Sequence, residues 1–93
     1  MGWSELTVRE RVLIHLRSLK GPIGQYDVDS NHTQAGIAMS VEISRKHVPR
    51  IVRVLISEKL VVESIGRVKN GKQRQLLYEL SHEGRISADE IAK

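Results

Sequence analysis

The residues of this sequence that can do chemistry are mostly basic, and they gather in one segment. Between Ser44 and Arg74, nine Lys and Arg side chains occur with only two acids, which gives the segment a net charge of +7. The remaining residues hold six cations and nine acids and carry −3. This distribution favours a polyanionic partner held by phosphate contacts, although a solvated basic surface without a partner explains the charge alone about as well. The cations are Arg45, Lys46, Arg50, Arg53, Lys59, Arg67, Lys69, Lys72 and Arg74.

Patterns that support catalysis or metal binding are incomplete in the sequence. The chain has no cysteine, which excludes disulfides, thiolate zinc sites and iron–sulfur clusters. Asp27, Asp29 and Asn31 resemble the start of a calcium loop, but His32 and Ala38 replace the Gly and the bidentate Glu that such a loop needs. The histidines lack i, i+4 spacing with a third ligand nearby, and neither a nucleophile elbow nor a glycine-rich phosphate loop occurs. The sequence therefore predicts a protein that is not an enzyme and has no metal and no cofactor.

Aromatic residues are too few for one class of nucleic-acid binder. They make up 3% of the chain, as Trp3, Tyr26 and Tyr78. Proteins that bind single strands or RNA loops usually stack bases on aromatic side chains, so the composition argues against these partners. Tyr78 is expected to face the core instead.

Length and composition indicate one globular domain. The 93 residues are 40% hydrophobic, which suffices for an aliphatic core, and no repeat or low-complexity tract divides them. We expect a single domain over residues 1–93 with its core at about 5–82. No apolar stretch is long enough to cross a membrane, and the first residues do not resemble a signal peptide. We therefore expect a soluble cytoplasmic protein without a membrane partner.

The elements that must position the basic residues begin with an amphipathic helix. Apolar residues at helical spacing predict this helix over about 5–20, and Gly21 ends it. Thr7 and Glu10 fit a capping box at its start. His15 is expected on the surface or at the boundary of this helix.

Two further helices are predicted after a polar connection. A short one lies at about 33–39, capped by Thr33, and a longer one runs from a Ser44 cap to about Lys59. Pro49 crowds the first turn of a helix that starts at Ser44, so either the helix begins about two residues later or its first turn is bent. One face of the longer helix is aliphatic, and the opposite face holds Lys46, His47, Arg50, Arg53, Val54 and Ser57.

A β-hairpin and a final helix complete the predicted elements. Residues 61–69 and 72–80 are rich in Val, Ile, Leu and Tyr, as is typical of strands. Asn70-Gly71 between them predicts a two-residue type I′ turn. Ser81 can cap a short last helix over about 82–92, which a glycine in its first turn weakens.

The tip of this hairpin is expected to carry unpaired positive charge. A two-residue turn puts Lys69 opposite Lys72 and Arg67 opposite Arg74. Like charges directly across a strand pair destabilise it, which suggests that an outside anion neutralises them. A one-residue bulge would instead place Gln73 opposite Arg67, and the sequence does not decide between these registers.

The order of helix, short helix, turn, basic helix and basic-tipped hairpin resembles the winged helix-turn-helix domain. The chain is most similar to MarR-like and related small archaeal and bacterial transcription regulators, which implies an α+β winged helix. Two features depart from the family: Lys59 stands where Gly is usual, and the long terminal helices of MarR-like dimers are lacking. The resemblance covers residues 7–86, and it is carried by Thr33-Gln34-Ala35-Gly36-Ile37-Ala38, Ser44-Arg45-Lys46-His47-Val48-Pro49-Arg50, Leu55-x-x-x-x-Leu60-Val61 and Tyr78-Glu79-Leu80-Ser81-x-x-Gly84.

The resemblance implies that the third helix enters the major groove and that the wing meets the backbone or the minor groove. A major groove ~12 Å wide admits one α-helix, and Arg can bond bidentately to guanine. Arg50 is therefore the main candidate for reading bases, with Lys46 and His47 as weaker ones. Ser44 and Arg45 are further candidates for DNA contact; Ser44 is also expected to cap this helix, and the alternative for Arg45, nearer the buried side, is to brace its start. Phosphate contacts are expected from Thr33, Gln34, Arg53, Arg67, Lys69, Asn70, Gly71, Lys72 and Arg74.

These observations predict a protein that binds double-stranded DNA and regulates transcription. The rival prediction is a winged helix used as a protein–protein interaction module of a larger complex, which the exposed position of Val54 favours. A third possibility, intermediate between these two, is an architectural DNA-binding protein, which would bind DNA without a preferred site. If the protein acts as a two-fold homodimer, the chain ends, Trp3 to Leu6 and Ile86 to Ile91, would form its interface, with half-sites ~34–36 Å apart.

Overall fold

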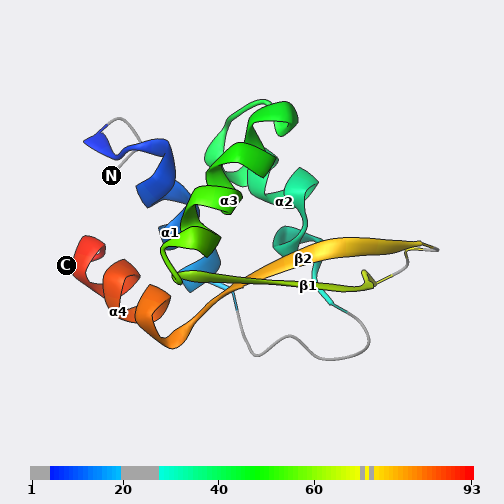
Figure 1. Ribbon diagram of the computed structural model, residues 1–93. Coiled ribbons are helices and arrows are strands. Elements are labelled where there is room, and N and C mark those ends of the chain that lie inside the picture. Colours follow the sequence, from blue (N-terminus) through cyan, green and yellow to red (C-terminus); the bar gives the residue numbers. More distant parts are fainter. Residues whose placement is uncertain (1–4, 20–27, 70, 72) are drawn as a thin grey trace.

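The computed structural model describes residues 5–19, 28–69, 71 and 73–93. Within them the chain forms four α-helices, two short 3-10 turns and one antiparallel hairpin, so the expected α+β class is confirmed (Figure 1). The described part of the chain contains no helix with the length and apolar character that crossing a membrane requires. In chain order the elements are α1 (Val8–Arg17), η2 (Ser30–His32), α2 (Gln34–Val41), η3 (Arg45–His47), α3 (Val48–Ser57), β1 (Val61–Arg67), β2 (Arg74–Leu80) and α4 (His82–Ile91).

Local capping residues set the start of three helices, as predicted. The Thr7 hydroxyl accepts from the Glu10 amide at 3.1 Å, and the Glu10 carboxylate accepts from the Thr7 amide at 3.0 Å, which completes the capping box of α1. The Thr33 and Ser81 hydroxyls cap α2 and α4 in the same manner. Helix α1 is shorter than expected because it ends at Arg17, and the predicted terminator Gly21 lies outside the described residues.

The prediction that Ser44 caps the third helix is wrong. Ser44 makes no side-chain capping bond, and it is followed by the 3-10 turn η3, so α3 begins only at Val48. Pro49 therefore lies in the first turn of α3. Backbone amides there have no acceptor within the helix, so the missing N–H of proline loses no hydrogen bond. Of the two alternatives that Pro49 raised, the later start is the one the chain adopts.

The end of α3 has a strained backbone at Lys59, the position at which the family usually has Gly. Lys59 has a φ of 65°, in the left-handed region that favours glycine. Its amide bonds to the Ile56 carbonyl at 2.9 Å, and the Leu60 amide bonds to the Leu55 carbonyl at 3.0 Å, which is the pattern of a Schellman motif. This motif turns the chain from α3 directly into β1.

The hairpin has the predicted register. Arg67 lies opposite Arg74, so the bulged alternative with Gln73 is excluded. The strands end at these two residues, and the Gly71 amide bonds to the Val68 carbonyl at 2.8 Å, whereas the predicted type I′ turn involves Asn70, which lies outside the described residues. Val68 leaves the hairpin because it pairs with Val28, a contact between distant parts of the sequence.

The core joins the helices to the base of the hairpin. Side chains from α1, α2, α3, α4 and both strands meet in it, and Tyr78 is fully buried there, as predicted. Gly84 is more than a weak point of α4. A Cβ at this position would collide with the Leu60 carbonyl oxygen, so glycine lets α4 pack closely against the end of α3. Figure 1 shows the hairpin projecting away from this core.

Candidate nucleic-acid interface

The first part of the candidate interface is the outer face of α3. Val48, Val52 and Leu55 bury the inner face in the core, which fixes the rotation of the helix. Arg50 and Arg53 are exposed on the opposite face, and Lys46 and His47 are exposed in the turn η3 directly before the helix. The residues that line a shallow groove of about 400 Å³ on this face are Lys46, Pro49, Arg50, Arg53, Val54 and Ser57.

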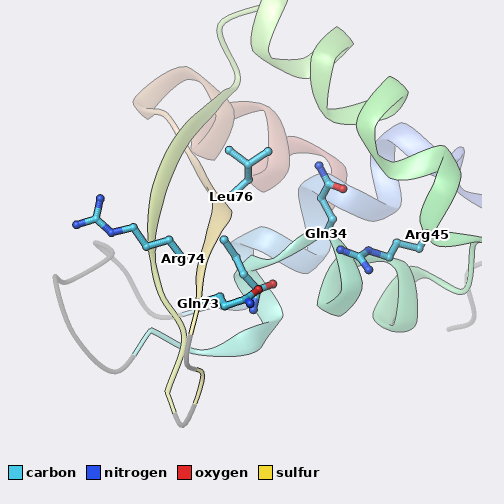
Figure 2. Close-up of a pocket in the computed structure, with 6 residues that line it drawn as sticks. Gln34, Arg45, Gln73, Arg74 and Leu76 are labelled. Carbon is cyan, nitrogen blue, oxygen red and sulfur yellow. The ribbon is translucent and has the colours of Figure 1, made fainter.

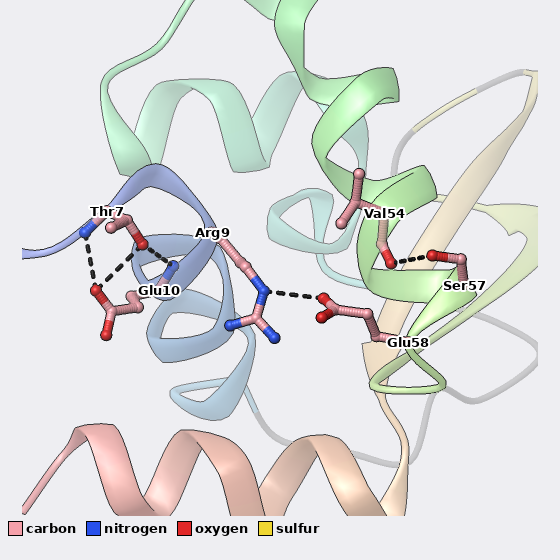
Figure 3. Close-up of polar contacts among 6 residues, drawn as sticks. All are labelled: Thr7, Arg9, Glu10, Val54, Ser57 and Glu58. Atoms are coloured by element: carbon pink, nitrogen blue, oxygen red, sulfur yellow. Dashed lines mark hydrogen bonds and ion pairs between the residues drawn. The ribbon is translucent and has the colours of Figure 1, made fainter.

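Both acids of the basic segment are bound to partners elsewhere. Glu58 Oε1 accepts from Arg9 Nε of α1 at 2.9 Å, as Figure 3 shows. Glu63 Oε2 accepts from the Tyr78 hydroxyl at 2.8 Å. In the described ranges, the ion pairs are Arg9–Glu58 and Arg17–Asp89, and neither involves a cation of the α3 face. The positive charge of that face is therefore not neutralised within the described chain.

A second groove of about 340 Å³ lies between the start of α2, the turn η3 and the wing. Gln34 is the first residue of α2 and Arg45 the first of η3, and the wing contributes the rest of the lining. Figure 2 shows Arg45 extending across this gap towards the wing. Arg45 is exposed, so its side chain is a wall of this groove rather than the alternative, a brace of the helix start. The wing residues of the lining are Gln73, Arg74, Gln75 and Leu76.

The two polar residues predicted at the start of α2 are already engaged. Thr33 is 3% exposed, and its hydroxyl donates to the Ser30 carbonyl at 2.7 Å while it accepts from the Gly36 amide at 3.0 Å. Gln34 Nε2 donates to the Tyr78 hydroxyl at 3.0 Å. Thr33 therefore positions the helix, and Gln34 is tied to the wing.

Sequence reasoning missed the hydrogen-bond chain that connects α2 to both strands of the wing. It runs from Gln34 to Tyr78 and from Tyr78 to Glu63. Burial raises the pKa of Tyr78, and the bond to the Glu63 carboxylate raises it further, so the hydroxyl stays protonated and donates. Gln34 and Tyr78 are 44 positions apart, and no local pattern could have indicated this contact.

The wing carries the remaining predicted cations. Arg67 and Arg74 face each other directly across the hairpin, and Lys69 follows in the turn; all three side chains are exposed. Gly71 lies in the turn, whereas Asn70 and Lys72 lie outside the described residues, which also leaves the predicted Lys69–Lys72 pairing undescribed. The described part of the wing therefore presents a cluster of positive charge beyond the core.

Two histidines, His15 and His32, and the described residues of the calcium-like sequence serve the fold, whereas Asp27 lies outside the described residues. His15 is 8% exposed, so of the expected surface and boundary positions the surface one is excluded, and its Nε2 bonds to the Asn31 carbonyl at 2.9 Å. Burial lowers the pKa of His15 below its usual 6.5. His32 Nδ1 bonds to the Tyr78 carbonyl at 2.8 Å, and Asp29 Oδ1 accepts from the Asn31 amide at 2.8 Å. Among the residues described, no three His, Asp or Glu side chains come together in a way that could hold a metal ion.

Comparisons with known proteins identify the fold. No family model matches the chain, and no curated protein matches its sequence. Two structures of ZitR from Lactococcus lactis, a MarR-family winged-helix regulator, are similar to this chain. The first aligns with a TM-score of 0.68 at 22% identity and covers 96% of this chain and 57% of its own. The second aligns with a TM-score of 0.66 at 24% identity and covers 91% of this chain and 49% of its own. A Listeria innocua protein of unknown function aligns with a TM-score of 0.61 at 23% identity, over 97% of this chain and 55% of that one. The chain thus spans about half the length of these proteins, and it has the winged-helix fold.

Proposed function

We propose that this protein binds double-stranded DNA through α3 and the wing and regulates transcription. The observation that carries the proposal is the positive charge on the outer face of α3, which has no ion-pair partner among the described residues because both acids of the segment are bonded to Arg9 and Tyr78 instead. An exposed helix of this charge fits a major groove ~12 Å wide and attracts the phosphates on both sides of it. Winged-helix regulators such as ZitR, which share the fold, support this assignment at the level of the fold.

Base reading is assigned to the first turns of α3. Arg50 lies near the middle of the exposed face, where its guanidinium can bond bidentately to guanine O6 and N7. Lys46 and His47, one turn earlier and also exposed, can reach neighbouring base edges. Arg50 is therefore the residue whose loss should alter sequence preference most.

Phosphate contacts are assigned to the rim of this face and to the wing. Arg53 lies one turn beyond Arg50, and Arg45 lines the groove between α3 and the wing. The Thr33 amide is already bonded to the Ser30 carbonyl at 3.0 Å, so the contact proposed at Thr33 is with the first helical amides that it precedes, and a second is proposed for the start of η3 at Ser44. The other contacts are proposed for Gln34, Arg67, Lys69, Asn70, Gly71, Lys72 and Arg74.

Regulation by occupying a promoter is most effective with a symmetric pair of such domains. We extend the proposal to a homodimer through the chain ends, of which Glu5, Leu6 and Ile86 to Ile91 lie in the described residues. Ile86 is 49% exposed on α4, beside α1. Two domains would then read half-sites ~34–36 Å apart. Small-angle scattering that gives a monomer mass at high concentration would contradict this extension.

A protein–protein interaction module is the second candidate function. Met39 is 83% exposed on α2, and Val54 is 46% exposed on α3 in the midst of the basic face. Apolar side chains in these positions are suited to a protein surface with acidic residues around an apolar centre. This candidate predicts that DNA binding is weak and that Met39→Ser impairs capture of the partner, whereas the DNA proposal predicts no effect of Met39→Ser on DNA affinity.

The proposal is tested by measuring affinity for a random-sequence duplex by fluorescence anisotropy at several salt concentrations. Neutralising about six phosphates should make log affinity fall against log salt with a slope near −5. Arg50→Ala should weaken binding, while Arg85→Ala, which removes an exposed cation from α4, is the matched control and should not. Binding no tighter than ~10⁻⁴ M at moderate salt, unchanged by Arg50→Ala, would overturn the proposal.

A further inference from the structure

The side of the wing that faces the helices has an acid at its base and cations towards its tip. Side chains two apart on a strand point to the same side of a hairpin, so three directly opposed pairs share this side. From the core to the tip they are Glu63–Tyr78, Ile65–Leu76 and Arg67–Arg74. Ile65 and Leu76 are 64% and 38% exposed, and they separate the acid from the cations. Among the described residues of the two strands, Glu63 is the one acid on this side.

The carboxylate of Glu63 is held in place, but its charge is not cancelled. The side chain is exposed, and its Oε2 accepts a hydrogen bond from the Tyr78 hydroxyl at 2.8 Å. A hydroxyl is neutral, so this bond fixes the carboxylate without neutralising it. The ion pairs of the described residues, Arg9–Glu58 and Arg17–Asp89, do not include Glu63. One negative charge therefore stays at the base of the wing.

Tyr78 places this charge beside the proposed phosphate contacts. Tyr78 is fully buried in the core, so its hydroxyl has a fixed position. The same hydroxyl accepts from Gln34 Nε2 at 3.0 Å, so two hydrogen bonds connect Glu63 to the start of α2. Gln34 also lines the groove that Arg45 and Leu76 border (Figure 2). A DNA strand bound along that groove comes close to the Glu63 carboxylate.

We infer that Glu63 weakens the binding of DNA of arbitrary sequence, because its fixed negative charge repels a phosphate at the base of the wing. The inference rests on the proposed function and adds to it a residue that opposes binding. Like charges brought together at an interface cost free energy and suppress association with the wrong partner. Phosphate contacts supply nearly all non-specific affinity, so a carboxylate in this position lowers it directly. Because a genome offers very many non-specific sites, more of the protein then stays free for a preferred one.

Glu63→Gln tests the charge alone. Glutamine has nearly the same size and keeps a carbonyl oxygen that accepts from the Tyr78 hydroxyl, so the wing should retain its structure. Glu83→Gln is the matched control, since it removes one negative charge from an exposed position on α4. Each protein is titrated into labelled random-sequence duplex by fluorescence anisotropy at several salt concentrations. Urea denaturation followed by circular dichroism confirms that both variants are folded.

The expected effect depends on salt. Glu63→Gln should bind the duplex roughly three- to fivefold more tightly than the wild type at low salt. The gain should shrink as salt increases, because the screening length falls from about 10 Å at 0.1 M to about 3 Å at 1 M. The slope of log affinity against log salt should therefore become steeper. Glu83→Gln should stay within about 1.5-fold of the wild type, because α4 lies outside the proposed interface.

Tyr78→Phe tests whether the hydroxyl positions the charge. Phenylalanine keeps the buried ring, but it leaves the Glu63 carboxylate free to turn into the solvent. Glu63→Gln should therefore gain less affinity in a Tyr78→Phe background than in the wild-type background. A loss of stability alone does not produce this difference, because both members of the comparison lack the hydroxyl.

Three results would overturn the inference. The first is affinity of Glu63→Gln equal to or below that of the wild type while Arg50→Ala still weakens binding, which leaves the proposed function intact. The second is an equal gain in Glu83→Gln, which would assign the effect to net charge rather than to position. The third is an equal gain from Glu63→Gln with and without the Tyr78 hydroxyl. A wild-type chain that binds no duplex would overturn the proposed function itself, and this inference with it.

Discussion

Two faces of this molecule use the same residue types in opposite ways. On the face formed by α1 and α4, Arg9 bonds to Glu58 at 2.9 Å and Arg17 bonds to Asp89 at 2.7 Å, so that cations hold elements together. On the face formed by η3, α3 and the wing, the described cations make no such pairs, and the nearby acids are bonded elsewhere. A basic residue thus indicates a partner only where the fold leaves its charge unpaired.

The largest effect on stability is expected for a substitution that disrupts the packing of α4. We expect Gly84→Ala to lower the free energy of unfolding by about 3 kcal/mol, because the new Cβ meets the Leu60 carbonyl and close packing must give way. Urea denaturation followed by circular dichroism measures this loss. Glu83→Ala, at an exposed neighbouring position, is the control and should change stability by less than about 0.5 kcal/mol. Equal stability of the two variants would show that α4 does not pack here as described.

Removing one Arg from each face should separate DNA affinity from stability. We expect Arg50→Ala to weaken binding to a preferred duplex by about 1–3 kcal/mol, as for a lost bidentate base contact, and to leave stability nearly unchanged. Arg17→Ala should do the reverse, with no change in affinity and a loss of at most about 1 kcal/mol in stability, since its ion pair is exposed. Anisotropy and urea denaturation of both variants check this. A loss of DNA affinity in Arg17→Ala equal to that in Arg50→Ala would contradict the assignment of DNA binding to the face of α3 and the wing.

The buried His15 should make the α1 side sensitive to acid. Burial lowers the pKa of His15, so the unfolded chain binds more protons than the folded one below pH 6.5. The free energy of unfolding should therefore fall as the pH decreases through 6.5 towards the lower folded-state pKa. His15→Gln keeps a donor for the Asn31 carbonyl but does not titrate, and should show a flatter pH dependence in urea denaturation. His82→Gln, at an exposed position, should follow the wild type, and parallel curves for all three proteins would count against this role of His15.

The smallest effect is expected at the junction of α3 and the wing. Lys59 has a positive φ, and we expect Lys59→Gly to raise the free energy of unfolding by about 1 kcal/mol through relief of this strain. Ser57→Gly, at the last residue of α3, should lower it by about 0.5 kcal/mol, because glycine has a lower helix propensity and the bond from the Ser57 hydroxyl to the Val54 carbonyl is lost. Thermal denaturation of both variants provides the comparison, and a loss of stability in Lys59→Gly would show that the lysine side chain contributes more than its backbone costs.

The sequence predicted those features that depend on neighbouring residues. Thr7, Thr33 and Ser81 cap their helices because a hydroxyl needs only the amide three residues ahead. The outer face of α3 was likewise predictable from helical spacing. Ser44 failed as a cap because Pro49 favours a later first turn, and this conflict could not be resolved from the spacing alone.

Features that depend on distant contacts were not predictable. The bridge between Val68 and Val28, forty positions earlier, is an example. The cations of the candidate site were therefore predictable from the sequence, but the contacts that surround them were not. Neither the engagement of Glu58 and Glu63 nor the groove that joins Arg45 to the wing has a local pattern, and the exposed pair of Ile65 and Leu76 depends on the register of the hairpin.

The most direct test of the account is a map of the DNA contact surface. Amide resonances of ¹⁵N-labelled protein should be followed by NMR during titration with a random-sequence duplex at low salt. The account predicts that the largest shifts occur over residues 44–57 and 65–76, and that residues 82–91 of α4 remain unchanged. Shifts confined to α1 and α4, or an unchanged spectrum, would contradict the central claim that the unpaired cations of α3 and the wing form the DNA-binding face.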